Sequence, residues 1–138
     1  MKIAYTAELT PMEGRPGYYV RIPDLDGCVT TGDTLADAIA QIRDAMGVYL
    51  LSLEDEAQPF PPARLPDDLA RTPGAFYALV DLDTLEYRKA TDTAAVRKNV
   101  TIPSWMAYRA DKLNLNVSNI LQNALEAAFA KRENEKTA

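Results

Sequence analysis

The side chains of Arg97, Asn99 and Thr101 have the types and the spacing that could read DNA. A guanidinium, an amide and a hydroxyl can each hydrogen-bond to base edges in the major groove. The three occupy alternate positions, and side chains alternate across a β-strand, so all three would share one face of a strand. Val100 and Ile102 would share the opposite face, where they could pack on a core. The segment is therefore predicted to be a DNA-reading strand.

Charge is divided unevenly along the chain. Residues 1–87 carry six Lys or Arg and fifteen Asp or Glu, a net charge of −9. Residues 88–138 carry nine and five, a net charge of +4, and the two parts together give the chain's −5. A basic tail on an acidic body favours nucleic acid at one end and a basic partner at the other. Charge also varies along chains that bind neither.

The composition narrows the chemistry that the chain can perform. Its 138 residues include one cysteine, Cys28, and no histidine. Zinc sites usually combine Cys with His, and Ser–His or Cys–His nucleophiles need an imidazole. General acid–base work would fall to carboxylates, Lys or Tyr. We therefore expect a protein that is not an enzyme and that needs no cofactor or metal.

The sequence has no membrane or secretion signal. Its densest apolar stretch, Met46 to Leu53, is far too short to cross a bilayer, and the N-terminus lacks the apolar run of a signal peptide. The single Cys28 cannot form a disulfide within the chain and fits a reducing compartment. We expect a cytoplasmic protein with no membrane partner.

The first 85 residues predict a β-β-β-α-β body of the α+β class. Alternating apolar residues and turn signals indicate strands at 3–9, 18–22, 28–31 and 76–80. Apolar residues at helical spacing from Leu35 to Leu53 indicate a helix, with Thr34 as its N-cap and Asp37 completing a capping box. A close approach of this helix to the sheet would explain Gly47 within it. Residues 54–75 hold five of the nine prolines and predict an extended loop.

The tail predicts a strand and two helices after a linker at 86–95. The first helix runs from Ser104 to about Leu113, and Asn116 or Ser118 can cap the second. Either Asn114 or Asn116 can take the left-handed conformation in the turn between them. One strand and two short helices cannot bury their apolar surface alone, and a lone strand has an unpaired edge. We expect residues 96–138 to form an intertwined homodimer.

Residues 95–132 resemble the ribbon-helix-helix fold of bacterial repressors, in which two strands form an antiparallel ribbon inside the major groove. The resemblance implies that Arg97, Asn99 and Thr101 read bases. It also implies that Ser118 and Asn119, at the start of the second helix, hold a phosphate through backbone N–H groups. Lys98 stands where the family has an apolar residue, so we expect it to reach a phosphate instead.

Residues 1–82 resemble the HicB antitoxin family. The stretch that carries the resemblance reads Val-Arg-Ile-Pro-Asp-Leu-Asp-Gly-Cys-Val-Thr-Thr-Gly-Asp-Thr-Leu over positions 20–35 and continues into an Ala-rich helix. Family members usually read Pro-Asp-Leu-Pro-Gly-Cys and then Gly-Asp-Thr, so Asp26 stands where proline is common. The resemblance implies a partial ribonuclease-H-like domain without its catalytic set.

Together the two resemblances imply a type II antitoxin. Residues 1–85 would bind and block a HicA-type toxin, a small basic ribonuclease that cleaves mRNA. Residues 96–138 would bind the operator DNA of the same operon and repress it. Asp24 and Asp26 are the candidate toxin-binding residues. Beyond the homodimer through the tail, a tetramer through the N-terminal domain is left open.

Two other functions fit parts of the sequence. The chain could be a plain ribbon-helix-helix repressor whose N-terminal domain senses a ligand or mediates oligomers. It could also be a Mg²⁺-dependent nuclease, because carboxylate clusters bind hard cations. The carboxylates concerned are Asp24, Asp26, Asp33 and Asp37. Turns and a helix cap account for most of these residues without any metal.

Overall fold

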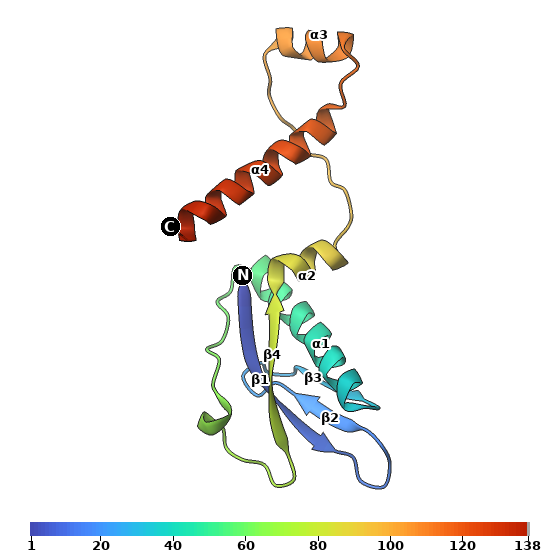
Figure 1. The fold of residues 1–138 in the computed structure, drawn as a ribbon, viewed down its shortest axis with the longest axis vertical. Coiled ribbons are helices and arrows are strands. Elements are labelled where there is room, and N and C mark those ends of the chain that lie inside the picture. Colours follow the sequence, from blue (N-terminus) through green and yellow to red (C-terminus); the bar gives the residue numbers. More distant parts are fainter. Residues whose placement is uncertain (138) are drawn as a thin grey trace. The chain divides into compact units, whose positions relative to one another are not determined.

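Four antiparallel strands form the sheet of the N-terminal unit. The computed structural model describes residues 1–137, and the chain divides into the units Met1–Ala94 and Ala95–Ala138. The strands are β1 (Lys2–Pro11), β2 (Tyr18–Arg21), β3 (Val29–Gly32) and β4 (Phe76–Asp83), in the sheet order β3-β2-β1-β4 (Figure 1). The predicted α+β class and β-β-β-α-β order are confirmed.

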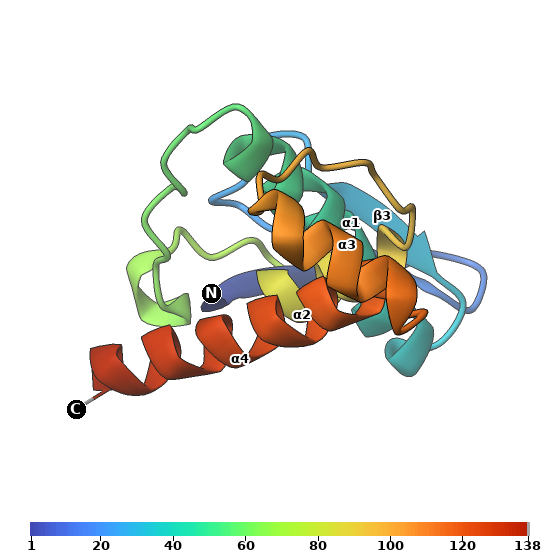
Figure 2. The same cartoon turned by 90° about the horizontal axis from the view of Figure 1, so that it is seen from above.

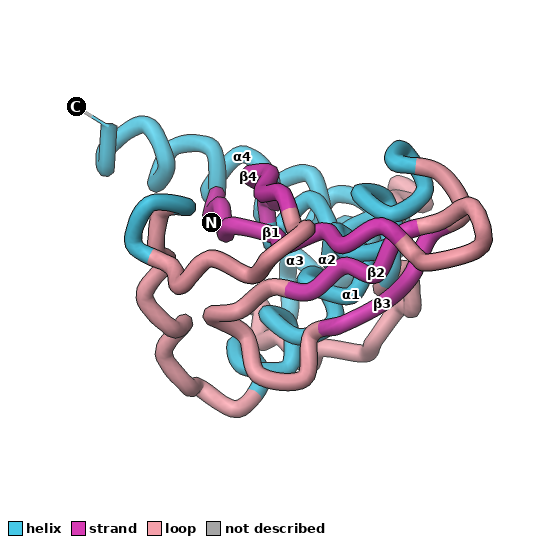
Figure 3. Tube along the Cα trace, turned by 90° about the horizontal axis from the view of Figure 1, so that it is seen from below, coloured by secondary structure: helices cyan, strands magenta, loops and turns pink. Residues whose placement is uncertain are grey.

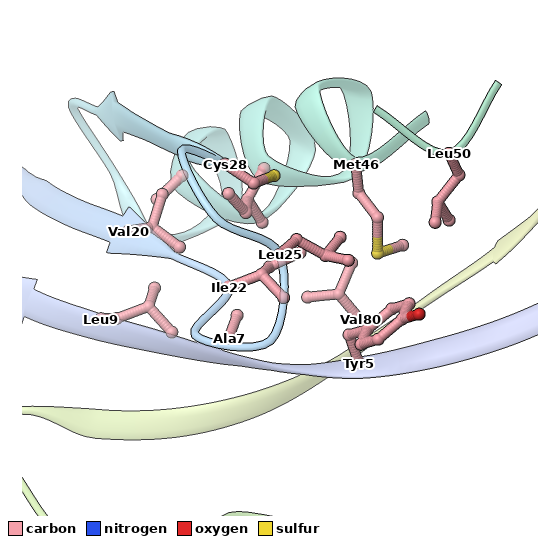
Figure 4. Close-up of a cluster of buried hydrophobic side chains, with 12 residues drawn as sticks. Tyr5, Ala7, Leu9, Val20, Ile22, Leu25, Cys28, Met46, Leu50 and Val80 are labelled. Carbon is pink, nitrogen blue, oxygen red and sulfur yellow. The ribbon is translucent and has the colours of Figure 1, made fainter. Parts of the chain in front are cut away.

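Helix α1 (Leu35–Asp55) lies across one face of this sheet. Thr34 begins it as predicted, because its Oγ1 accepts a hydrogen bond from the backbone N–H of Asp37 at 3.1 Å. The apolar stripe of α1 packs on the strands and forms a fully closed core (Figure 4). Its members on α1 are Ala38, Ile42, Met46 and Leu50, and those on the strands include Tyr5, Ala7, Leu9, Val20 and Val80.

The long loop between α1 and β4 covers part of the other face. Thr6 and Glu8 point away from α1 and are nevertheless buried. The Thr6 hydroxyl donates to the backbone oxygen of Arg64 at 2.7 Å, which holds the middle of the loop against β1. The loop returns the chain from Glu56 to Ala75 at the start of β4 (Figure 3). Strand β1 is thus enclosed on both faces.

A network around Glu8 holds the end of this loop. Its carboxylate accepts from Arg21 Nε at 3.0 Å, from the Thr72 hydroxyl at 3.1 Å and from the Tyr77 hydroxyl at 3.3 Å. The hydrogen bond from Arg21 is the largest cause that lowers the pKa of Glu8, and it outweighs the opposing effect of burial. The charged form of Glu8 therefore joins β1, β2, β4 and the loop.

The outer edge of β4 is capped from α1. The Arg43 guanidinium donates through Nε to the backbone oxygen of Asp81 at 3.0 Å and lies 3.3 Å from its carboxylate. The backbone N–H of Thr84 donates to Met1 O, so these two residues form a hydrogen-bonded pair of the antiparallel ladder. Hydrogen-bonded and non-hydrogen-bonded pairs alternate along the ladder, and Asp81, opposite Ala4, belongs to a non-hydrogen-bonded pair. The backbone N–H and C=O of Asp81 therefore point away from β1. Arg43 therefore satisfies a carbonyl that no strand reaches.

A short helix, α2 (Thr84–Thr91), occupies most of the segment predicted as a linker at 86–95. Asp83 caps it by accepting from the N–H groups of Leu85 and Glu86 at 3.0 and 3.3 Å. Helix α2 also corrects the interpretation of Gly47, because a Cβ there would lie 2.5 Å from the Tyr87 ring. The close approach is between α1 and α2, not between α1 and the sheet.

The C-terminal unit contains α3 (Ser104–Lys112) and α4 (Val117–Thr137), joined by a tight turn (Figure 2). Asn114 takes the left-handed conformation, with φ of 51°, and the N–H of Leu115 bonds back to Ala110 O at 3.0 Å. The predicted strand differs: residues 92–103 are neither helical nor paired into a sheet. A strand needs a neighbour for its backbone groups, and one copy of this segment has none.

Replacement of Glu8 with Gln is expected to lower the free energy of unfolding by about 1–3 kcal/mol at pH 7, because a charged acceptor with several donors is lost. The pKa of Glu8 is lower in the folded state than its ordinary value of 4.5. The Glu8 carboxylate therefore makes its full contribution to the free energy of unfolding above pH 4.5, and this contribution is lost as the pH falls through the folded-state pKa. Urea denaturation from pH 7 to 3 should show the difference from wild type shrinking below about 4.5. Glu13→Gln, at an exposed turn, is the control, and an equal loss in both variants would contradict the network's role.

Candidate functional site

The predicted base-reading residues lie on an exposed and unpaired segment. Arg97, Asn99 and Thr101 are exposed, as is Lys98 between them. The apolar Val100 is also more than half exposed, at 54%. Backbone N–H and C=O groups of such a segment are open to pairing with another strand. The segment has the composition of a DNA-reading strand. In a single copy of the chain, however, it is not paired with another strand.

The start of α4 carries the predicted phosphate-binding residues. Of the two capping candidates, the structure selects Asn116, whose side-chain oxygen accepts from the N–H of Asn119 at 3.1 Å. Ser118 and Asn119 lie in the first turn and are exposed. The first N–H groups of a helix have no partner within the helix and carry the positive end of its dipole. This end of α4 therefore suits an anion.

An apolar groove of about 300 Å³ opens between α3 and α4. Trp105 is 63% exposed and Ile120 is 50% exposed, although both are apolar residues of a kind normally buried. The lining residues are Ile102, Trp105, Met106, Arg109, Ala110, Leu113, Leu115, Val117 and Ile120. A continuous apolar surface of this kind indicates an interaction surface rather than a finished fold.

The two candidate toxin-binding residues have different surroundings. Asp24 is only 5% exposed and accepts from the Nε and the backbone N–H of Arg64, at 2.6 and 2.7 Å. This carboxylate therefore anchors the long loop, a structural role that its position in the sequence did not reveal. Asp26 is exposed in the turn that includes Gly27, whose φ is 80°. Of the two, Asp26 alone is exposed to solvent.

The carboxylates of the nuclease alternative do not form a cluster in the described residues. Asp24 pairs with Arg64, whereas Asp37 lies in the first turn of α1 and its backbone N–H is held by Thr34. Within residues 1–137, no three groups of the Asp, Glu and Cys types gather closely enough to hold a metal ion. The described part of the chain therefore offers no preformed cluster for that chemistry.

The sheet also has an open area that was not predicted from the sequence. A groove of about 280 Å³ lies on the face turned away from α1, beside the part that the loop covers. Tyr19 and Val29 line it and are 57% and 62% exposed, and Arg21 and Thr31 lie next to them in the same strands. The alternation of the strands contained the signal, because Tyr19 in β2 and Val29 in β3 lie on the face opposite to the core-facing Val20.

Helix α2 was not predicted from the sequence either. Asp83 followed three positions later by Glu86 is a helix-start pattern of the same kind as the one recognised at Thr34. Tyr87 then anchors the helix: its hydroxyl donates to the Asp44 carboxylate at 2.8 Å. Burial, followed by this contact with Asp44, raises the pKa of Tyr87 to about 12. Tyr87 thus stays protonated at neutral pH and can keep donating.

Length and apolar character together decide whether a helix can cross a bilayer. No helix in the part of the chain that the structure describes has enough of both.

A family model covers most of the chain. A family model described as "HicB_like antitoxin of bacterial toxin-antitoxin system" matches residues 5–132. The chain is also similar to an uncharacterized 14.9 kDa protein from the rep-hol intergenic region of Haemophilus phage HP1. The two are 23% identical over 99 residues, which is 70% of this chain and 71% of the phage protein.

Two solved structures share the fold over nearly the whole chain. The crystal structure of the Burkholderia pseudomallei antitoxin HicB is 27% identical, with a TM-score of 0.54, and the match covers 91% of this chain and 98% of that one. A toxin-antitoxin complex from Streptococcus pneumoniae contains a chain that is 21% identical, with a TM-score of 0.57 and coverage of 93% and 99%. The family match spans both units described above, and the chain belongs to the HicB-like antitoxins of bacterial toxin-antitoxin systems.

Proposed function

We propose that this antitoxin neutralises a HicA-type, mRNA-cleaving toxin through its N-terminal unit and represses its own operon through its C-terminal unit. The observation that carries the proposal is the separation of an acidic, core-bearing unit from a basic unit whose apolar groove is uncovered. Both activities are binding activities, and neither requires catalysis or a cofactor. Operator DNA as a partner implies work in the cytoplasm.

Charge supports the assignment of partners to units. Residues 1–94 carry eight Lys or Arg and sixteen Asp or Glu, a net charge of −8. Residues 95–138 carry seven and four, a net charge of +3. An acidic surface attracts a small basic toxin, and a basic surface attracts the phosphate backbone of DNA. The proposed toxin-binding domain ends at 94 rather than 85, because α2 belongs to the N-terminal unit.

DNA recognition would come from a ribbon made by two copies. Pairing of residues 96–102 between copies would satisfy their backbone groups and turn Arg97, Asn99 and Thr101 to the same side. The ribbon would enter the major groove with these side chains at the base edges. Lys98 and the first turn of α4, with Ser118 and Asn119, would hold phosphates. The same pairing would cover the apolar groove between α3 and α4.

Toxin binding is proposed for the exposed surface of the N-terminal unit. Tyr19 and Val29 form an uncovered apolar area, and Asp26 adds a carboxylate beyond the end of the same sheet strands. Aromatic and apolar side chains at the centre of an interface usually contribute most to affinity. Asp24, by contrast, would act through the loop that it holds. A tetramer through this unit would compete for the same kind of surface.

Replacement of Arg97 or Asn99 with Ala is expected to weaken binding to the DNA upstream of the operon by about 1–3 kcal/mol each, because a base contact is lost. Binding is measured by fluorescence anisotropy at several salt concentrations, and wild-type affinity should fall steeply with salt. Arg15→Ala removes an exposed cation from the other unit and serves as the control. Unchanged affinity in both base-reading variants would overturn the strand assignment.

Replacement of Ile120 with Asp is expected to shift the chain from dimer to monomer, because a charge would enter the apolar groove of the dimer interface. Sedimentation velocity over a concentration series measures the shift. Gln122→Asp places the same charge at an exposed position on α4 and should leave the dimer intact. A variant Ile120→Asp that remains dimeric would exclude this groove from the interface.

Induction of the adjacent small reading frame alone is expected to arrest growth, and co-expression of this chain should relieve the arrest. A fragment of residues 1–94, which contains the whole described core, should also relieve it while losing operator binding. Arrest that persists although the full chain is expressed and folded would contradict toxin neutralisation. That outcome would favour a repressor whose N-terminal domain senses a ligand or mediates oligomers.

A further inference from the structure

Helix α2 is weakly embedded in the N-terminal unit. It is eight residues long, and Thr84 at its start is its only buried residue. The described core cluster draws its side chains from the sheet, the β2–β3 turn, α1 and the loop, and none from α2. Elements with few buried apolar contacts open at lower free energy than the core does. Helix α2 can therefore leave α1 without opening the core.

A single aromatic side chain seats α2 on α1. The Tyr87 ring lies against Gly47, where any Cβ would collide with three of its carbons at 2.5–2.7 Å. Its hydroxyl donates to the carboxylate of Asp44 at 2.8 Å and lies 3.2 Å from the backbone oxygen of the same residue. The missing side chain at Gly47 thus forms the recess that Tyr87 occupies.

A second contact is ionic and partly exposed. Arg88 Nη2 lies 2.9 Å from the carboxylate of Asp55 and 3.7 Å from that of Glu54, near the C-terminal end of α1. Ion pairs exposed to water contribute little and are weakened by salt. Tyr87 is therefore the contact on which the docking of α2 depends.

The docking of α2 sets the length of the connection to the C-terminal unit. With α2 folded and docked, residues 92–95 alone separate it from the proposed DNA-reading segment at 96–102. Four extended residues span at most about 14 Å, whereas the eleven residues 85–95, which follow the buried Thr84, span at most about 40 Å when α2 is unwound. Undocking and unwinding of α2 would therefore nearly triple the length of extended chain between the two units.

We propose that α2 is a detachable latch, seated by Tyr87 in the recess at Gly47, that switches the connection between the two units from short to long. In the short state four residues separate α2 from the proposed DNA-reading segment. In the long state the longer connection would let the N-terminal unit of each copy bind a partner while the ribbon remains on DNA. The consequence for DNA-bound chains rests on the proposed function, but the latch itself does not.

Hydrogen–deuterium exchange of the full chain without DNA tests the latch. Amides of α2 are expected to exchange on the order of tenfold or more faster than those of β1 and of the centre of α1. Tyr87→Ala should accelerate exchange further in residues 84–95 alone, and Tyr19→Ala, at an exposed tyrosine on the sheet, should not. Exchange of α2 at the rate of β1, or acceleration that spreads equally into β1, would overturn the proposal.

A double-mutant cycle separates the recess from general damage to α1. Gly47→Ala should accelerate exchange of α2 in the wild-type chain, because the added methyl displaces Tyr87. In a Tyr87→Ala chain the same change should leave α2 exchange unaltered and raise the thermal midpoint, because alanine favours a helix over glycine. Equal effects of Gly47→Ala in both chains would refute the recess. If the wild-type chain gave these exchange results but did not bind operator DNA, the proposed function would be refuted, whereas the latch would not.

Discussion

Strand β1 depends on being enclosed from both sides, and the N-terminal unit is built around that enclosure. Five consecutive residues, 5–9, are buried, although successive side chains of a strand point to opposite faces. The stripe of α1 covers one face, and the Pro-rich loop covers the other. An antiparallel sheet can leave one face in water, so the loop is what distinguishes this strand from an ordinary surface strand.

Polar groups hold the loop in place, alongside its buried Leu69 and its partly buried Phe60. Glu8, Thr6 and Asp24 are buried or nearly buried, and each has a partner at hydrogen-bond distance from another part of the chain. No buried side-chain nitrogen or oxygen in the described residues lacks a partner. Because an unpaired buried polar group is costly, these contacts specify one path for the loop. The neighbouring area of β2 and β3 remains open and available.

Local patterns predicted much of this arrangement. The Thr34 cap, the apolar stripe of α1 and the β-β-β-α-β order of elements all follow from residues within a few positions of one another. The turn between α3 and α4 was predicted in the same way, with Asn114 and Asn116 as alternatives for its left-handed residue. Asp24 and Arg64 are forty positions apart, and no local pattern pairs them. Helix α2 was overlooked because it has a start signal but one apolar anchor, Tyr87, instead of a stripe.

The predicted strand at 96–102 illustrates a different limit. Its alternation is clear, yet a strand is defined by the backbone it pairs with, and a single chain offers no second copy. The apolar groove between α3 and α4 has the same cause: a single copy has nothing to cover its exposed side chains. The sequence of the C-terminal unit therefore contains the alternation of a strand and the apolar spacing of two helices. In one copy, however, the described part of this unit has neither a paired strand nor a closed core.

The contact of Arg43 with Asp81 has a consequence for assembly. Unpaired sheet edges invite strands from other molecules, and long edges with apolar side chains are the most prone to it. Strand β4 is eight residues long and includes the exposed Leu79, so it is the more hazardous of the two edges. A guanidinium fixed on one of its outward carbonyls interrupts the row that an incoming strand would need. The helix that closes the core thus also protects the sheet against aggregation along β4.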